Sequence, residues 1–174
     1  AVDMPVQADA DTGYGNAVNV HHTVKAFEKA GVDSVMIEDQ VFPKRCGHFT
    51  GKAVIPAAEM AAKVRAAADA REDPNLLIIA RTDARAVDGL DAALDRAGLY
   101  VEAGADLTFV EAPASAAEMR EITGRLAVPQ VANMVVGGRT PLLPQDELAG
   151  IGFGMVLYAN AALQAAMKAM AEVL

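Results

Sequence analysis

The stretch Ser34-Val35-Met36-Ile37-Glu38-Asp39 joins a short apolar run to two consecutive carboxylates. Five other short apolar runs, rich in β-branched residues, follow the same plan and alternate with Ala-rich stretches of helical periodicity. Near-continuous apolar strands joined by helices indicate a parallel sheet covered on both faces. The sequence therefore predicts an α/β fold made of six consecutive strand–helix units.

The predicted elements cover the chain without a linker or a low-complexity tract, so we expect one domain over residues 1–174. The predicted strands are residues 5–8, 34–37, 76–80, 107–110, 130–132 and 153–157. The predicted helices are residues 17–30, 57–71, 89–103, 115–126, 145–149 and 160–174. Three glycines, Gly31, Gly104 and Gly150, stand where a helix end needs a left-handed residue.

Two architectures accommodate six such units. One is an open doubly wound sheet, and the other is part of a (β/α)8 barrel, whose usual size is about 250 residues. The chain starts at Ala1 without a Met and stops at Leu174 inside a helical pattern, which we interpret as a fragment. That interpretation favours a TIM-type barrel truncated to its last six units. Both architectures place chemistry at the carboxyl ends of the strands.

Composition excludes several classes of protein. With 53% apolar and 22% charged residues over 174 positions, the chain is not of the disordered type, and it has no run long enough to span a membrane. A net charge of −8 argues against nucleic acid as the main partner. A single cysteine, Cys46, excludes an internal disulfide and a multi-cysteine zinc site. We therefore expect a cytoplasmic protein.

Polar side chains follow five consecutive predicted strands. They are Asp9 and Asp11, Glu38 and Asp39, Arg81 and Asp83, Glu111, and Asn133. A single polar residue at a strand end is usually a helix cap or a turn residue. Five such groups that a parallel sheet directs at one pocket indicate a functional site. Among them, Arg81 is the predicted anion anchor because its fork holds a carboxylate by two bonds, while Arg85, close to Asp83, is expected to be structural.

Asp9, Asp11 and Glu38 form an all-oxygen cluster. Oxygen ligands without His or Cys suit a hard cation, Mg²⁺ or alternatively Mn²⁺. The alternative is an Asx-turn loop with solvated acids. Gly13-Tyr14-Gly15 is a weak nucleotide signal, because the full glycine-rich spacing and a Walker lysine motif are absent from the sequence.

The connection over residues 39–56 is long, as binding loops and lids often are, and it contains Lys44-Arg45-Cys46-Gly47-His48. Cationic neighbours lower the pKa of a thiol, which makes Cys46 a candidate acid, base or nucleophile. The alternative is a small buried apolar residue. His48 is expected to orient the thiol or bind a substrate carboxylate, unless it is an ordinary exposed loop histidine.

These motifs, taken together, resemble the isocitrate lyase/phosphoenolpyruvate mutase superfamily. The resemblance covers essentially the whole chain, and it is carried by residues 9–15 (DADTGYG), 37–40 (IEDQ), 44–48 (KRCGH), 80–84 (ARTDA) and 109–112 (FVEA), followed by Asn133, Gly137-Gly138 and Thr140-Pro141. It is strongest to the branches of 2,3-dimethylmalate lyase and of the petal-death-type oxaloacetate hydrolase and lyase, with methylisocitrate lyase a little further away.

The resemblance implies a (β/α)8 barrel with Mg²⁺ at the strand tips, entered here at its third strand, and a homotetramer in the full-length form. It implies lysis of a carbon–carbon bond in a 2-hydroxy dicarboxylate or tricarboxylate. Cys46 would then protonate the carbanion, and Arg81 would hold the keto-acid carboxylate or oxyanion. Lys44, Arg45, Gly47 and His48 would shape the loop, Glu111 and Asn133 would complete the pocket, and Tyr14 would help to select the substrate. Oxaloacetate hydrolysis and an inactive fragment remain alternatives.

Overall fold

The computed structural model describes residues 3–46 and 51–174. Its strands are β1 (Gln7–Asp9), β2 (Ser34–Glu38), β3 (Leu77–Thr82), β4 (Leu107–Val110), β5 (Val131–Asn133) and β6 (Met155–Leu157). Its helices are α1 (Ala17–Lys29), α2 (Ala57–Ala70), α3 (Leu90–Glu102), α4 (Ala116–Arg125), α5 (Gln145–Ile151) and α6 (Ala161–Val173), with a short 3₁₀ turn at Ala84–Ala86. Every predicted strand and helix is thereby confirmed within a few residues, and the 3₁₀ turn is an addition.

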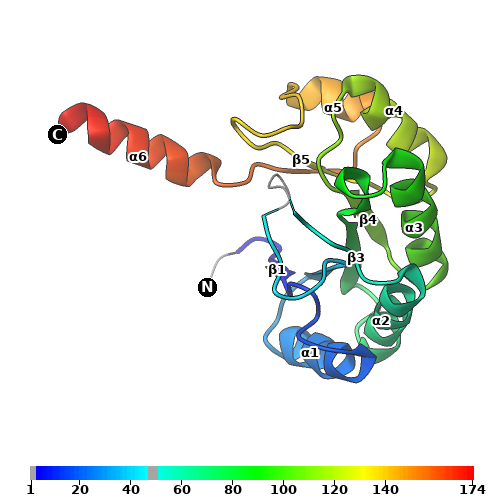
Figure 1. The fold of residues 1–174 in the computed structure, drawn as a ribbon. Helices are drawn as coiled ribbons and strands as arrows, with labels where there is room; N and C mark the ends of the chain where they lie inside the picture. Colours follow the sequence, from blue (N-terminus) through cyan, green and yellow to red (C-terminus); the bar gives the residue numbers. More distant parts are fainter. Residues whose placement is uncertain (1–2, 47–50) are drawn as a thin grey trace.

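All paired strands are parallel and follow one another in chain order. β1, β2, β3 and β4 form one sheet, and β5 and β6 form a second. A parallel bridge between Thr108 and Gln130 links the two sheets, and the Thr108 hydroxyl donates a 2.7 Å hydrogen bond to the Gln130 side chain. The order contains no reversal, whereas a doubly wound sheet reverses its strand order at a switch point. Figure 1 shows helices α1 to α5 in an arc outside the strands.

Strands β2 to β5 are buried, whereas β1 and β6 are only partly buried. The buried residues alternate between two apolar clusters, one on each face of the sheet. Val35, Ile37 and Ile78 pack on the outer side against Val20 and Val24 of α1 and against α2 and α3. The intervening residues Met36 and Ile79 form a second cluster on the opposite face, together with Leu107 and Phe109 of β4 and Val131 of β5. A strand that is buried on both faces reads as a continuous apolar run, which is the pattern in the sequence.

Local signals set the element ends. The Asn16 side chain accepts hydrogen bonds from the backbone N–H groups of Val18 and Asn19, and the Asn19 side chain accepts one from the Asn16 backbone N–H. This reciprocal pair fixes the start of α1. Gly31 and Gly104 have positive φ as expected. The expectation for Gly150 is wrong: α5 continues through it, and the left-handed residue is Gly152, with φ 110°. The helix simply runs two residues beyond its predicted end.

The last helix differs from the others. α6 has no buried residue, and in Figure 1 it projects away from the remainder of the chain. None of the helices in residues 3–46 and 51–174 is long and apolar enough to cross a membrane.

Candidate active site

The side chains at the strand ends share one face of the sheet. Alternate residues of a strand point to the same side, so a residue two positions beyond an inner-face residue continues that face. The four such pairs are Met36 with Glu38, Ile79 with Arg81, Phe109 with Glu111, and Val131 with Asn133, each apolar member belonging to the inner cluster. The predicted site residues of four neighbouring strands therefore converge, and all four are buried.

Arg81 lies at the centre of this group. Its Nε and Nη2 donate hydrogen bonds of 2.9 and 3.2 Å to the two carboxylate oxygens of Asp83. Its Nε lies 3.5 Å from Glu38 Oε2, and its Nη1 lies 3.6 Å from Glu111 Oε2. The guanidinium also stacks over Phe109, 5.0 Å from the ring centroid. One edge of the predicted anion anchor is thus occupied by Asp83, which leaves the Nη1 side facing the site.

Asp83 is shared between two cations. Lys52 Nζ lies 2.7 Å from Asp83 Oδ1, and both side chains are almost fully buried, at 2% and 0% exposure. Burial alone would raise the pKa of Asp83, but hydrogen bonds and charge attraction from Arg81 and Lys52 hold it below its ordinary value. Lys52 follows the 47–50 segment, so this ion pair joins the long connection to the end of β3.

Glu111 and Asn133 contact each other at the neighbouring strand ends. Asn133 Nδ2 donates to both carboxylate oxygens of Glu111 at 3.3 Å. The Asn133 Oδ1 atom is buried and accepts no hydrogen bond from any described residue. A buried polar atom without a partner costs free energy, so this oxygen is available to a bound molecule.

The predicted metal-ligand set surrounds a lysine in this structure. Lys44 Nζ lies 2.9 Å from Asp11 Oδ1, 3.4 Å from Glu38 Oε2 and 3.8 Å from Asp9 Oδ2. Burial by itself would lower the pKa of Lys44, but these three carboxylates raise it above its usual value. Residues 3–46 and 51–174 contain no group of three or more His, Cys, Asp or Glu side chains already arranged to hold a metal ion.

The donor chemistry nevertheless fits a hard divalent cation. Glu38 is 1% exposed, and its Oε1 accepts no hydrogen bond from the described residues. Burial raises the pKa of Glu38 to about 7, which shows how poorly its charge is compensated. Mg²⁺ keeps several of its own waters, so it needs only one or two direct carboxylate ligands from such a cluster. An ammonium group among three carboxylates marks the place as a cation site.

The loop that carries Asp9 and Asp11 is held by local geometry and by α2. Asp9 Oδ1 accepts a 2.9 Å hydrogen bond from the Asp11 backbone, which forms a tight turn. At Gly13, with φ 84°, an added Cβ would lie 2.4 Å from Val20 Cγ2, so only glycine fits. The Lys63 ammonium on α2 donates to the Thr12 carbonyl at 3.1 Å, and burial lowers the pKa of this lysine.

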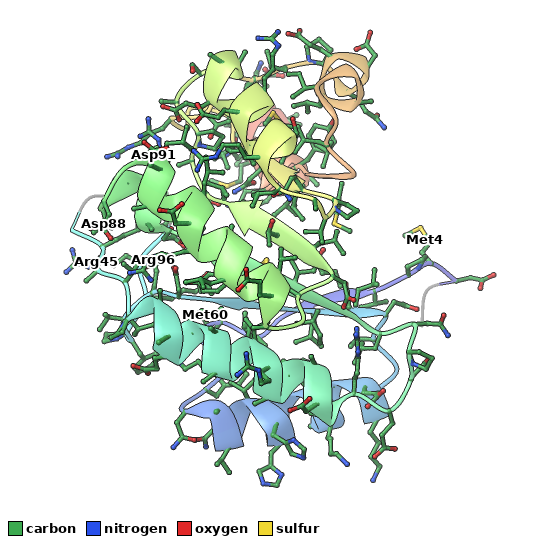
Figure 2. All side chains as sticks on the ribbon, turned by 90° about the vertical axis from the view of Figure 1, so that its right-hand side faces the viewer. Met4, Arg45, Met60, Asp88, Asp91 and Arg96 are labelled. Atoms are coloured by element: carbon green, nitrogen blue, oxygen red, sulfur yellow. The ribbon has the colours of Figure 1, made fainter. Side chains whose placement is uncertain are left out.

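Asp39 is a buried hub behind the site. It is fully buried and accepts hydrogen bonds from the Thr82 hydroxyl at 2.7 Å, the Asp83 backbone at 2.9 Å and the Tyr100 hydroxyl at 2.8 Å. Burial raises the pKa of Asp39, which these hydrogen bonds oppose. Arg96 Nη1 lies 3.5 Å from Asp39 and donates to the Ile55 carbonyl, and Figure 2 shows Arg96 on α3 beside Asp88.

The long connection is folded back at its base. Gln40 and Val54 form an antiparallel bridge, so residues 39–41 pair with residues 53–55. The Gln40 side chain also accepts from the Arg45 backbone N–H at 3.0 Å and donates to the Arg45 carbonyl at 2.8 Å. Cys46 is exposed with a free thiol, which removes the alternative of a small buried apolar residue. Gly47 and His48, both predicted site residues, lie outside the described residues.

Tyr14 lines a different space from the strand-end group. It is 55% exposed and borders a cavity of about 460 Å³. The cavity is lined by Thr12, Tyr14, Gly15, Gln40, Phe42, Ile55, Glu59 and Lys63, and none of the described strand-end residues is among them. The structure therefore does not bring Tyr14 together with Arg81 and Glu111.

The structure resolves the expectation for Arg85 and adds residues that were not expected. Arg85 is structural, as predicted, but its partner is Glu118 of α4, at 2.9 and 2.7 Å, and not the neighbouring Asp83. Lys52, Lys63 and the hub role of Asp39 were not predicted. Lys63 had a detectable signal, because it stands at helical spacing among the buried positions Met60 and Ala67 of an Ala-rich helix.

Comparison with known proteins assigns the chain to a family. The model of the phosphoenolpyruvate phosphomutase family matches residues 1–174. The chain is 49% identical over 172 residues to 2,3-dimethylmalate lyase of Eubacterium barkeri, covering 99% of this chain and 60% of that protein. It is 47% identical to 2-methylisocitrate lyase of Aeropyrum pernix, covering 99% of this chain and 56% of that protein. The chain thus spans little more than half of these relatives.

Solved structures give the same assignment. A 2,3-dimethylmalate lyase, described as a PEP mutase/isocitrate lyase superfamily member, superposes with a TM-score of 0.92 at 38% identity, over 97% of this chain and 57% of its own. An oxaloacetate acetylhydrolase bound to its product oxalate superposes with a TM-score of 0.89 at 32% identity, over 97% of this chain and 57% of its own. A phosphonopyruvate hydrolase in complex with oxalate and Mg²⁺ superposes with a TM-score of 0.82 at 35% identity, over 99% of this chain and 60% of its own.

Proposed function

Because this chain belongs to the phosphoenolpyruvate mutase/isocitrate lyase superfamily, we propose that it carries the active site of a carbon–carbon lyase. The substrate is a 2-hydroxy dicarboxylate of the substituted malate or methylisocitrate type. The products are an α-keto acid, such as pyruvate, and a second carboxylate. The relatives named as 2,3-dimethylmalate and 2-methylisocitrate lyases support this substrate class.

One observation supports this proposal more strongly than the others. Arg81, Glu111 and Asn133 are buried side by side on the inner face, next to the carboxylates of Asp9, Asp11 and Glu38 at the adjoining strand ends. Buried charges that are only partly compensated are costly for stability, so their concentration at the carboxyl ends of parallel strands favours a catalytic role.

Asp9, Asp11 and Glu38 would hold the divalent cation, Mg²⁺ or alternatively Mn²⁺. The all-oxygen donor set and the unpartnered Glu38 Oε1 support this choice, and a structural neighbour is described with Mg²⁺ bound. When bound, the cation offsets the negative charge that develops on the keto-acid half during cleavage. Lys44 must then leave its position among the three carboxylates, because two cations would repel each other there.

The chain's own residues would bind the substrate and guide the reaction. The Nη1 side of Arg81 attracts the carboxylate or oxyanion of the keto-acid half, since its other edge is held by Asp83. Glu111 and Asn133 close the pocket beside it, and the free Asn133 Oδ1 accepts a hydrogen bond from the substrate. A base takes the hydroxyl proton, and the oxygen forms the C=O bond of the keto acid as the neighbouring carbon–carbon bond breaks. The electron pair of the broken carbon–carbon bond passes to the departing carboxylate fragment.

Cys46 would protonate that carbanion-like fragment, which completes the second product. Its exposed thiol and its place two residues after Lys44 support this role. Lys44, Arg45, Gly47 and His48 would meet the second carboxylate of the substrate, and Tyr14 would contribute to selectivity from the adjoining cavity. The Gln40 side chain fixes the backbone of Arg45, so the thiol is presented from an anchored turn.

We extend the proposal to the whole protein. The six units form an arc of an eight-stranded barrel and a single partial catalytic domain, entered at the third strand, and the full-length protein is a cytoplasmic homotetramer. Consecutive parallel strands with helices outside them support the barrel. Coverage of only 56–60% of the curated relatives supports the view that strands outside this chain complete it.

A second candidate is hydrolysis of oxaloacetate to oxalate and acetate. The likeness to oxaloacetate acetylhydrolase bound to oxalate, with a TM-score of 0.89, favours keeping it. The same carboxylates and Arg81 would serve the same keto-acid half, while Cys46 would have a different task.

The test is a product assay on the full-length protein with and without EDTA. The panel contains 2,3-dimethylmalate, 2-methylisocitrate and isocitrate, with oxaloacetate followed separately by loss of its enol absorbance. We expect metal-dependent pyruvate from one substituted substrate. Oxalate from oxaloacetate without any pyruvate would favour the hydrolase instead, and activity from this chain alone would remove the inactive-fragment alternative.

A further inference from the structure

We propose that Lys52 is a positioning residue that keeps the Arg81–Asp83 pair cationic, so that Arg81 retains its attraction for an anionic substrate group. The inference rests on the proposed function of the site, and it concerns a residue to which that function gives no role. The contact of Lys52 that carries the inference is the ion pair with Asp83. Lys52 acts through Asp83, whose Oδ1 it contacts at 2.7 Å.

Arg81 is surrounded by negative charge. Three described carboxylates, Asp83, Glu38 and Glu111, lie within 4 Å of its guanidinium, at 2.9, 3.5 and 3.6 Å. Asp83 takes the Nε–Nη2 edge with two hydrogen bonds, so an isolated Arg81–Asp83 pair would be neutral. A neutral pair no longer attracts an incoming carboxylate by its net charge, whereas an anion anchor requires that attraction.

Lys52 changes that balance. Its ammonium shares the Asp83 carboxylate with Arg81, so the three groups together carry one net positive charge. The Lys52 and Asp83 side chains are 2% and 0% exposed, and Arg81 is 10% exposed, so water screens their interactions weakly. The extra charge is therefore felt at the Nη1 side of Arg81, where the substrate anion is proposed to bind.

A purely structural role makes a different prediction. If Lys52 only satisfies a buried carboxylate, Lys52→Met harms the fold locally, and Asp83→Asn removes that need without raising the affinity for an anion above that of wild type. If Lys52 acts through net charge, Lys52→Met makes the group neutral, Asp83→Asn makes it doubly positive, and the double variant returns it to one positive charge. Asp83→Asn alone therefore separates the two roles, because only the charge role predicts tighter oxalate binding than in wild type. The double variant leaves no unpaired buried carboxylate that could prevent folding, so it checks that the effect of Lys52→Met is not a failure to fold.

The experiment measures oxalate binding to the full-length protein at saturating Mg²⁺ by calorimetry, together with Mn²⁺ affinity and a thermal melt. We expect Lys52→Met to weaken oxalate binding about tenfold or more, with Mn²⁺ affinity within about threefold. Lys52→Arg and the Lys52→Met/Asp83→Asn double variant should bind oxalate within about threefold of wild type. Asp83→Asn alone should bind oxalate more tightly than wild type. Lys25→Met is the matched control, because Lys25 pairs with Glu72 at an exposed position of α1 and should change nothing.

Three results would overturn the inference: oxalate affinity unchanged in Lys52→Met, a double variant that binds as weakly as the single one, and an Asp83→Asn variant that binds no more tightly than wild type. Each leaves the lyase proposal intact if the wild-type protein releases pyruvate. A wild-type protein that neither binds oxalate with Mg²⁺ nor shows metal-dependent turnover would overturn the inference and the proposed function together.

Discussion

The Cys46 thiol lies in the 39–56 connection, exposed to solvent and two residues after Lys44, whose ammonium lies among three carboxylates. The Cys46 sulfur makes no hydrogen bond with any carboxylate of the described residues. Its proposed chemistry is therefore separable from cation binding, which makes single-residue tests informative.

We predict that Cys46→Ala and Cys46→Ser in the full-length protein lower kcat at least ~10²-fold, because the proposed proton donor is lost. Mg²⁺ affinity should change little, since the thiol is outside the carboxylate cluster. Steady-state kinetics and a metal titration of each variant measure the two quantities. Near-normal turnover by either variant would contradict the role given to Cys46.

Asp83 gives a prediction about acid stability. Its pKa is lowered in the folded protein by Arg81 and Lys52 despite burial, so its ionised form stabilises the fold. This contribution is complete above the ordinary carboxyl value of about 4 and is lost as pH falls through the lower folded value. Denaturant unfolding between about pH 2 and 7 should show a smaller loss of stability below pH 4 for Asp83→Asn than for wild type. An equal loss of stability in Asp83→Asn and in wild type over this pH range would contradict the prediction.

At the scale of elements, helices support the site from behind the strands. α2 contacts the loop that carries Asp9 and Asp11 through Lys63, and α3 contacts the base of the long connection through Arg96 and Tyr100. These contacts join segments that are 41 to 61 residues apart in the chain. Each helix can therefore be tested by one substitution that leaves the proposed substrate contacts untouched.

Lys63→Met should weaken Mn²⁺ binding to the full-length protein by about tenfold. The reason is that the Thr12 carbonyl loses its buried ammonium partner, and the loop that carries Asp9 and Asp11 is then less well held. Electron paramagnetic resonance of Mn²⁺ measures the affinity. Lys25→Met on α1 is the control, and equal affinities of the two variants would mean that α2 does not position the loop.

Tyr100→Phe should lower the free energy of unfolding by about 2 kcal/mol. The Tyr100 hydroxyl is the donor of a 2.8 Å hydrogen bond to the fully buried Asp39, and its removal leaves that carboxylate short of one partner. The midpoint of urea denaturation measures the change. The control is Tyr158→Phe, at a half-exposed position, whose free energy of unfolding should stay within about 0.5 kcal/mol of wild type. Equal losses of unfolding free energy in the two variants would contradict the prediction.

At the scale of the whole molecule, the unusual feature is apolar surface at the end of the chain. Leu163, Met167 and Met170 of α6 are each 57–59% exposed and stand at helical spacing, so they form one stripe, which continues to Leu174. The edge strands β1 and β6 leave further backbone groups without a strand partner on one side among the described residues. Exposed apolar stripes of this kind usually mark a surface that another molecule covers.

We predict that this 174-residue chain self-associates in solution, because burying the α6 stripe removes apolar surface from water. A variant with Leu163→Gln, Met167→Gln and Met170→Gln should associate less. Sedimentation velocity over a range of concentrations measures the distribution. A wild-type chain that stays monomeric, with a cooperative melt equal to that of the full-length protein, would contradict the prediction.

Part of the site was readable in the sequence because it depends on local pattern. Glu38, Arg81, Glu111 and Asn133 each follow an apolar run, and parallel strands end at one edge, so their convergence needed no knowledge of distances. The arrangement of their partners was not readable. Arg85 was expected beside Asp83 because the two are close in sequence, but the 3₁₀ turn between them carries Arg85 to Glu118 on α4.

The sequence by itself determined the alternation of six strands and six helices, the polar strand ends and the family, since these follow from short-range periodicity and contiguous motifs. Tertiary structure alone decided that Asp83 is shared by Arg81 and Lys52, that Lys63 holds the Thr12 carbonyl, and that Lys44 lies among three carboxylates. The physical reason is that such buried pairings join residues as much as 51 positions apart along the chain. Their strength depends on distance and burial, which only the packed fold sets.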